Sequence, residues 1–155
     1  AIMGFQDEPE FNSSGLLNQT AINRHCIELM QQFDVRPVAP TLKSAGFSGG
    51  NQQKLVIARE MAPKPKILLV GQPTRGVDIG AIEFIHQQIV ALRDAGSAVL
   101  VVSVELEEIL SLCDRILVMS EGRIVGDVAA SETDARALGL MMSISRSGEQ
   151  QEATE

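Results

Sequence analysis

The chain has 155 residues, of which 45% are hydrophobic and 21% charged, a balance that suits a globular domain with a core of its own. A net charge of −7 argues against nucleic-acid binding, because phosphate backbones are held by clustered Lys and Arg. No apolar run approaches the ~20 residues of a membrane helix. Cys26 and Cys113 lie far apart in the sequence and are expected to be free thiols in a reduced, cytosolic protein.

The first part of the chain predicts helices joined by loops. Residues 18–33 carry apolar side chains at helical spacing, namely Ile22, Cys26, Leu29, Met30 and Phe33. A loop containing Pro37 and Pro40 follows. The segment "NQQKLVIAREMA" then predicts a second helix, which "PKP" ends.

The rest of the chain alternates between strand and helix patterns. The runs "KILLV" and "AVLVVS" predict strands buried on both faces, with a helix over residues 78–95 between them and Gly96 as its C-cap. After them come a short helix in "ELEEILSLC", two strands around a Glu-Gly turn and a helix over roughly residues 134–142. This alternation predicts an α/β fold with a mostly parallel sheet.

The stretch "FSGGNQQKLVIARE" carries the strongest chemical signal. Ser48 is placed to cap the helix that follows, and Gly49 and Gly50 leave the backbone N–H groups of the first turn uncovered. Such a helix N-terminus attracts an anion through its unpaired N–H groups and its dipole. Taken alone, the same residues also fit an ordinary Ser-capped helix after a flexible loop.

The neighbouring motifs extend this signal. "FSGGNQQ" resembles the signature motif of ABC-transporter ATPases, usually written LSGGQ, in the form found in importers of sugars and nucleosides. "KILLVGQPTRGVD" resembles the Walker B strand, Pro-Thr turn and D-loop of that family, and "AVLVVSVELEEILSLCDRILVMSEGRIVG" resembles its switch strand, helix and closing hairpin. The resemblance covers Gly46 to Gly126. It implies a partial P-loop NTPase (ABC ATPase) fold with a helical subdomain, from which the Walker A portion is missing.

The resemblance also implies roles for individual residues. The signature positions would bind the ATP held by a partner ATPase domain, in trans; they are Ser48, Gly49, Gly50 and Asn51, with Gln52 at the edge of that site. Asp78 matches the D-loop aspartate. It is also placed to cap the helix that begins after it, and both roles can hold together.

Three matched positions depart from the family pattern. Gly71 replaces the Walker B aspartate and offers no side-chain oxygen to Mg²⁺. Gln72 replaces the carboxylate that polarises the attacking water, and a neutral amide cannot accept a proton. Val104 replaces the switch histidine and can neither donate to nor accept from a phosphate. No catalytic residue is therefore expected to be intact, and the chain resembles the second, degenerate ATPase domain of a fused pair.

The phosphate-binding loop G-x-x-x-x-G-K-[ST] is absent, since no Gly-Lys pair occurs in the chain. We therefore expect a fragment that begins inside the helical subdomain (residues 1–45) and continues through the signature, Walker B, D-loop and switch core (46–130). A C-terminal helix (131–144) and a flexible tail (145–155) would follow. The fragment alone is predicted to be inactive and to bind no cofactor, whereas the full-length protein would use ATP with Mg²⁺.

The resemblance finally implies partners and a place in the cell. Expected partners are a second ATPase domain and membrane-spanning permease subunits, which would hold the protein at the cytoplasmic face of the membrane. The segment before Gly46 is where a permease would dock. His25 and His86 do not have the spacing of a metal-ligand pair, so no metal is assigned to the chain itself. An alternative stays open: a soluble, non-transport ABC-type module with a regulatory or scaffolding role.

Overall fold

The computed structural model describes residues 1–143. They belong to two compact units, Ala1–Leu100 and a second unit that begins at Val101. The tail expected at residues 145–155 lies outside the described residues, and the domain boundaries expected from the sequence remain predictions. Within the described part of the chain, no helix has both the length and the apolar character that crossing a membrane requires.

The first unit opens with a small antiparallel hairpin, β1 (Asn12–Ser13) and β2 (Leu16–Leu17). Sequence reasoning missed this hairpin because its strands are too short to show an alternating pattern. Helix α1 (Gln19–Gln32) follows, with Asn18 as its N-cap and Phe33 as its C-cap. The helix predicted at residues 18–33 is thereby confirmed, and four of its five pattern residues are buried, namely Cys26, Leu29, Met30 and Phe33.

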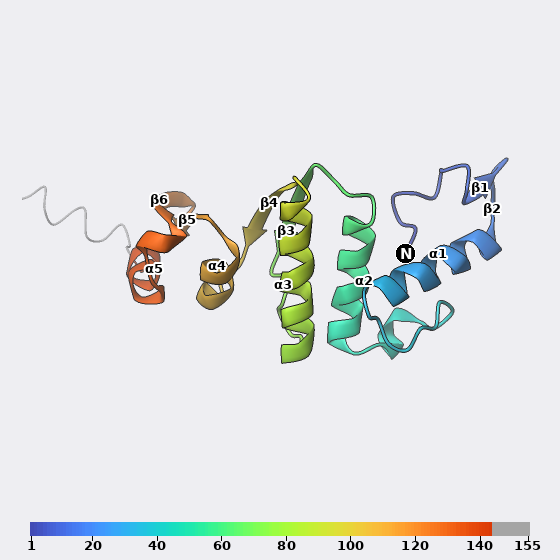
Figure 1. Ribbon diagram of the computed structural model, residues 1–155, viewed down its shortest axis with the longest axis horizontal. Helices are drawn as coiled ribbons and strands as arrows, with labels where there is room; N and C mark the ends of the chain where they lie inside the picture. The colour runs from blue at the N-terminus through green and yellow to red at the C-terminus, as the bar shows by residue number, and fades with distance from the viewer. Residues whose placement is uncertain (144–155) are drawn as a thin grey trace, which may run out of the picture. The chain divides into compact units, whose positions relative to one another are not determined.

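Two further helices complete the helical part of this unit. A short 3₁₀ turn, η1 (Ser44–Gly46), leads into α2 (Gly49–Met61), and α3 (Ile79–Asp94) lies beside α2 (Figure 1). Phe33 meets Phe84 of α3 edge to face, with 6.3 Å between ring centroids. Helix α3 ends at Ala95 rather than at the predicted Gly96, which follows the cap in a left-handed conformation (φ 98°) that suits glycine.

Strands β3 (Ile67–Gly71) and β4 (Ala98–Val102) pair with each other and are joined through α3, the kind of connection that parallel neighbours need. The prediction that both strands are buried on both faces is wrong for the described residues. Leu68 is buried, but Ile67, Leu69 and Leu100 are 67%, 70% and 53% exposed. Apolar composition predicted the strands correctly, but nothing within residues 1–143 covers their second face.

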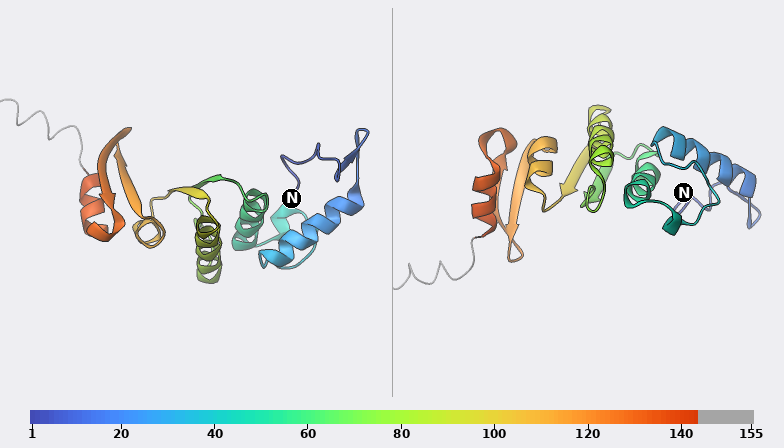
Figure 2. Two further views of the ribbon diagram at one scale, coloured as in Figure 1. Left: turned by 45° about the horizontal axis from the view of Figure 1, so that its top comes forward. Right: turned by 90° about the horizontal axis from the view of Figure 1, so that it is seen from below.

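The second unit contains α4 (Leu106–Leu112), the antiparallel hairpin of β5 (Arg115–Ser120) and β6 (Arg123–Ala129), a 3₁₀ turn η2 (Ala130–Glu132), and α5 (Ala135–Met142). The predicted Glu-Gly turn joins the two strands, and α5 lies along the hairpin (Figure 2). The core of this unit consists of Ile109, Ile116, Val118 and Leu138. The order of strands and helices predicted after residue 17 is confirmed, and the described strands form three two-stranded sheets.

Candidate functional site

The N-terminus of α2 is the centre of the candidate site. Ser48 is its N-cap, and Ser48 Oγ accepts hydrogen bonds from the Asn51 backbone N–H at 3.4 Å and from Asn51 Nδ2 at 2.9 Å. The first turn of a helix leaves its N–H groups without intrahelical partners, and here the residues that supply them are glycines. The predicted cap is thus confirmed, and this end of the helix offers the donors that an anion needs.

The amides of the motif are held by backbone groups on either side. Asn51 Oδ1 accepts the Arg36 backbone N–H at 2.7 Å. Gln52 Nε2 donates to the Phe47 carbonyl oxygen at 2.9 Å. Gln52 therefore braces the turn that enters the helix, while Asn51 connects the helix to the loop after α1.

The glycines of the motif have a steric reason that sequence reasoning did not find. A Cβ on Gly49 would lie 3.0 Å from the Gly76 carbonyl oxygen. A Cβ on Gly50 would lie 2.9 Å from Asp78 Oδ2 and 3.1 Å from Ala81 Cβ. The signature helix therefore approaches the D-loop so closely that neither position accepts a side chain without a shift of its neighbour.

Asp78 connects the D-loop to the next helix. Its Oδ1 accepts the Ala81 backbone N–H at 2.9 Å, which makes it the N-cap of α3 and confirms the local role predicted from the sequence. Because its other carboxylate oxygen lies 2.9 Å from the place that a Cβ on Gly50 would take, the two motifs pack closely against each other. The structure brings together the predicted residues from Ser48 to Gln52 and Asp78.

The end of β3 presents a different chemistry. Gly71 is the last residue of the strand and is exposed, and a Cβ built there would meet no atom within 4 Å. Gln72 follows with a left-handed φ of 51°, and its carbonyl oxygen accepts the Arg75 N–H at 3.2 Å. The turn then continues through Pro73 and Thr74, which are both buried. Gly71 has room for a larger side chain but supplies no side-chain oxygen for a cation, and Gln72 supplies only a neutral amide.

Val104 lies between β4 and α4 in the second unit and is 63% exposed. An apolar side chain in this position cannot exchange hydrogen bonds with a nucleotide or a neighbouring base. No cluster of three or more His, Cys, Asp or Glu that could hold a metal ion occurs within residues 1–143. Gly71, Gln72 and Val104 offer none of the carboxylate oxygens that Mg²⁺ prefers, so these residues do not fit the ion.

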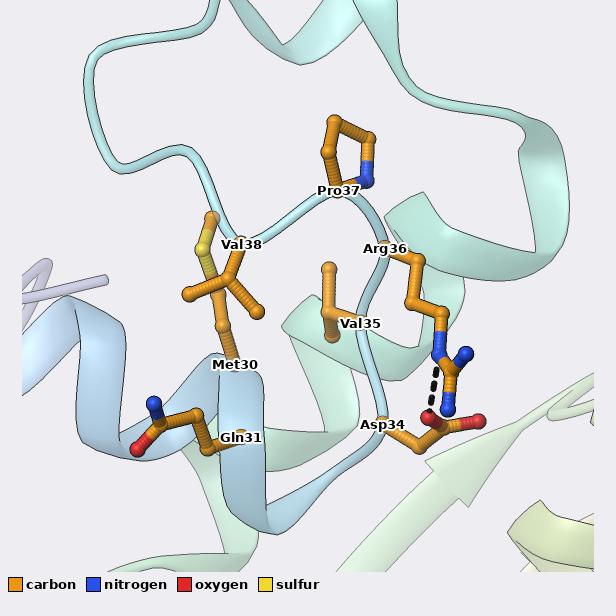
Figure 3. Close-up of a pocket in the computed structure, with 7 residues that line it drawn as sticks. All are labelled: Met30, Gln31, Asp34, Val35, Arg36, Pro37 and Val38. Carbon is orange, nitrogen blue, oxygen red and sulfur yellow. Dashed lines mark hydrogen bonds and ion pairs between the residues drawn. The ribbon is translucent and has the colours of Figure 1, made fainter.

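The segment Asp34–Arg36, between α1 and η1, is the part of the site that sequence reasoning missed. Figure 3 shows it along one side of a pocket of about 450 Å³, with the Arg36 guanidinium against the Asp34 carboxylate. Arg36 Nε donates to Asp34 Oδ1 at 2.8 Å, and Lys54 Nζ of α2 donates to Asp34 Oδ2 at 3.2 Å. The hydrogen bond from Arg36, followed by that from Lys54, lowers the pKa of Asp34 below its ordinary value.

Lys54 is buried although it carries a charge. Its side chain is only 11% exposed, and Nζ lies 4.7 Å from the centre of the Phe84 ring. The ammonium group donates both to the carboxylate and to the carbonyl oxygen of Asp34, each at 3.2 Å. A buried ammonium needs such partners, and this contact fastens α2 to the segment before it.

Comparisons with known proteins identify relatives of this chain. No family model matches the chain. The nucleoside import ATP-binding protein NupA of Lactococcus lactis is 47% identical over 135 residues, covering 87% of this chain and 27% of that protein. The guanosine import ATP-binding protein NupO of Bacillus subtilis is 45% identical over 132 residues, covering 85% of the chain and 26% of the relative.

Solved structures place the fold in the same group. An ATP-binding subunit of an ABC transporter aligns with a TM-score of 0.61 at 20% identity, covering 91% of this chain and 57% of the other. A dimeric ATP-binding cassette in a post-hydrolysis state with ADP and Pi aligns with a TM-score of 0.63 at 25% identity, covering 77% and 52%. The chain thus spans about a quarter of the length of its curated relatives; it has the fold of an ABC ATPase, and over most of its own length it is homologous to ABC import ATP-binding proteins.

Proposed function

We propose that this chain serves an importer of a nucleoside or simple sugar by lending its signature helix, in trans, to an ATP site on a partner ATPase domain. The observation that carries the proposal is the N-terminus of α2, where Ser48 and Gly49 are exposed and Gly50 is buried against Asp78 and Ala81. The relatives named for nucleoside import support the class of cargo.

The role of the helix would be positioning and electrostatic stabilisation. ATP with Mg²⁺ is the substrate of the full-length protein in this proposal, with the metal held by the partner domain. Ser48 and the N–H groups of Gly49 and Gly50 would face the γ-phosphate as charge builds up during transfer. Phosphoryl transfer depends chiefly on such fixed donors.

Of the two ATP sites in such a pair of domains, the one built on this chain's own Walker B and switch positions would contribute little to hydrolysis. The support for this lies in Gly71, Gln72 and Val104, none of which offers a carboxylate or an imidazole. Loss of a positioned base alone costs roughly 10²–10⁴ in rate. We therefore assign the chain to the degenerate ATPase domain, and hydrolysis to the site that its signature helix completes.

Permease subunits are the proposed membrane partners, and through them the protein would sit at the cytoplasmic face of the membrane. The segment before Gly46 is the proposed docking surface, supported by Val38 and Leu42, which are 44% and 39% exposed on the loop that borders the pocket. Co-purification with a multispanning membrane protein is expected. A soluble scaffolding module would instead purify without one.

The test of the trans role is Ser48→Arg in the full-length protein assembled with its partners. A guanidinium at the start of α2 fills the anion position, so transport and most ATPase activity should be lost. Ser131→Arg is the matched control, because Ser131 is also exposed and lies in η2, outside both the motif and the proposed docking surface. Full activity in Ser48→Arg would refute the proposed function.

A further inference from the structure

The direction in which Ser48 donates its proton is set by its neighbours. Ser48 Oγ accepts two hydrogen bonds from Asn51, one from the backbone N–H and one from Nδ2. A hydroxyl has two acceptor lone pairs and one proton to donate. With both lone pairs occupied, the proton of this exposed side chain points to a partner outside the helix. The serine is thereby fixed as a donor.

The orientation of the Asn51 amide is set in turn by the loop after α1. The Arg36 backbone N–H lies 2.7 Å from Asn51 Oδ1 and can only be met by an acceptor. The amide oxygen therefore faces Arg36, and its NH₂ group faces Ser48. With the amide turned over, the oxygen would face Ser48 instead and would take the serine proton for itself.

The segment that holds this orientation is fastened to the same helix one turn later. Asn51 and Lys54 are three residues apart, so they share one face of α2. Asp34 binds the Lys54 ammonium through its carboxylate and its carbonyl oxygen, and Val35 between the two anchor points is fully buried. The segment is thus bonded to α2 at two places, through Asp34 to Lys54 and through Arg36 to Asn51. These contacts hold the Arg36 N–H toward Asn51.

We propose that Asn51 is a positioning residue that fixes the Ser48 hydroxyl as a donor, and that the segment Asp34–Arg36 holds Asn51 in the orientation this requires. The proposal rests on the proposed function, since the acceptor of the serine proton would be the γ-phosphate oxygen of ATP on the partner domain. Asp34 and Arg36 lie outside the signature motif. In this proposal they determine, through Asn51, that the Ser48 hydroxyl donates a hydrogen bond and does not accept one.

The test is a double-mutant cycle on the full-length protein assembled with its partners, with kcat and KM for Mg-ATP measured separately. Asn51→Asp keeps the acceptor for Arg36 but replaces the NH₂ group, so the carboxylate takes the serine proton. A carboxylate in the first turn of a helix is stabilised by the helix dipole, so Asn51→Asp should not unfold α2. We expect kcat to fall about 10- to 100-fold, the cost of a lost hydrogen bond to a charged group. Asn51→Leu removes both amide bonds but leaves the serine proton free, and should cost less.

Asn51→Asp could lower kcat in two ways: the new carboxylate could take the Ser48 proton, or it could repel the γ-phosphate directly. Repeating the change in Ser48→Ala separates the two effects. Where the hydroxyl is already gone, Asn51→Asp should lower kcat by no more than about twofold further, since coupled sites are not additive. Two results would overturn the positioning role of Asn51 and leave the trans role standing. One is an equal loss of kcat from Asn51→Asp in the wild type and in Ser48→Ala, and the other is a greater loss of kcat in Asn51→Leu than in Asn51→Asp. An unchanged kcat in Ser48→Ala would instead contradict both the proposed function and the positioning role of Asn51.

Discussion

The start of α2 and the end of β3 are both turns of the first unit, but they differ in the side chains that they present. At the start of α2, Ser48, Asn51 and Gln52 each make a hydrogen bond, and both glycines are required by close packing. At the end of β3 the backbone turn is preserved, with Pro73 and Thr74 buried, but the side chains that a metal or a water would need are absent.

In the proposed function, positioning and hydrolysis are separable within one chain. The β3 turn leads into the loop of Gly76 and Asp78, whose oxygens lie 3.0 Å and 2.9 Å from the places that a Cβ on Gly49 and on Gly50 would take. In the same proposal, acids at positions 71 and 72 can be absent without disturbing this packing, since a Cβ on Gly71 would meet no atom within 4 Å. Changes at the start of α2 should therefore be far more costly than changes at the end of β3.

The largest effect on stability is expected at Gly50. Gly50→Ala places a Cβ 2.9 Å from Asp78 Oδ2 and 3.1 Å from Ala81 Cβ, so the α3 cap or the helix pair must shift. We expect the free energy of unfolding to fall by about 1–3 kcal/mol, as for other overpacked sites. Gly139→Ala in α5 is the matched control, since no atom lies within 4 Å of a Cβ there, and it should gain about 0.5–1 kcal/mol. Denaturant unfolding measures both; equal effects would contradict the packing account.

A smaller effect is expected where α2 is fastened to Asp34. Asp34→Ala leaves the buried Lys54 ammonium without its carboxylate, whereas Lys54→Met removes the charge and keeps most of the apolar contact with Phe84. Asp34→Ala should therefore lower Tm more than Lys54→Met, because an unpaired buried charge costs more than an absent one. The reverse order would show that the ion pair does not fasten the helix.

The same contact should depend on pH in a defined direction. Hydrogen bonds from Arg36 and Lys54 lower the pKa of Asp34 in the folded chain below its ordinary value of 3.8. The stabilisation is therefore complete above that value and is lost as the pH falls through the lowered pKa. The difference in Tm between the wild type and Asp34→Ala should be constant near neutral pH and shrink below pH 3.8. A difference that does not change with acid would contradict this.

The smallest effect is expected at Gln72. This residue holds a left-handed φ of 51°, which glycine adopts without steric cost. Gln72→Gly should keep the ATPase rate of the full-length protein within about twofold, since no positioned base is removed, and should leave Tm unchanged or slightly raised. A large loss of ATPase activity would show that Gln72 takes part in hydrolysis after all.

The predictable part of the structure is the part that local signals control. Asn18, Ser48 and Asp78 each cap a helix through a bond to a residue three positions on, so sequence spacing was enough to find the helix starts. The apolar runs also located β3 and β4 correctly. Their exposed faces were not predicted, because burial depends on what covers a strand rather than on its own composition.

The parts that escaped prediction depend on contacts between distant residues. Arg36 meets Asn51 across 15 positions, and Asp34 meets Lys54 across 20. Neither contact has a spacing rule, and Asp34 and Arg36 by themselves look like ordinary loop residues. The steric need for glycine at position 50 likewise comes from Asp78, in a different motif.

In the proposed function, the start of α2 contacts a nucleotide held by another domain, and cross-linking tests this contact directly. In the assembled full-length protein, Ser48→Cys would be treated with an ATP analogue that carries a thiol-reactive group on its γ-phosphate, with Ser131→Cys, exposed in η2, as the control. We expect the thiol introduced by Ser48→Cys to be labelled above the control, and only when the partner domain keeps its phosphate-binding loop. Labelling that persists without that loop, or that does not exceed the control, would contradict the trans role.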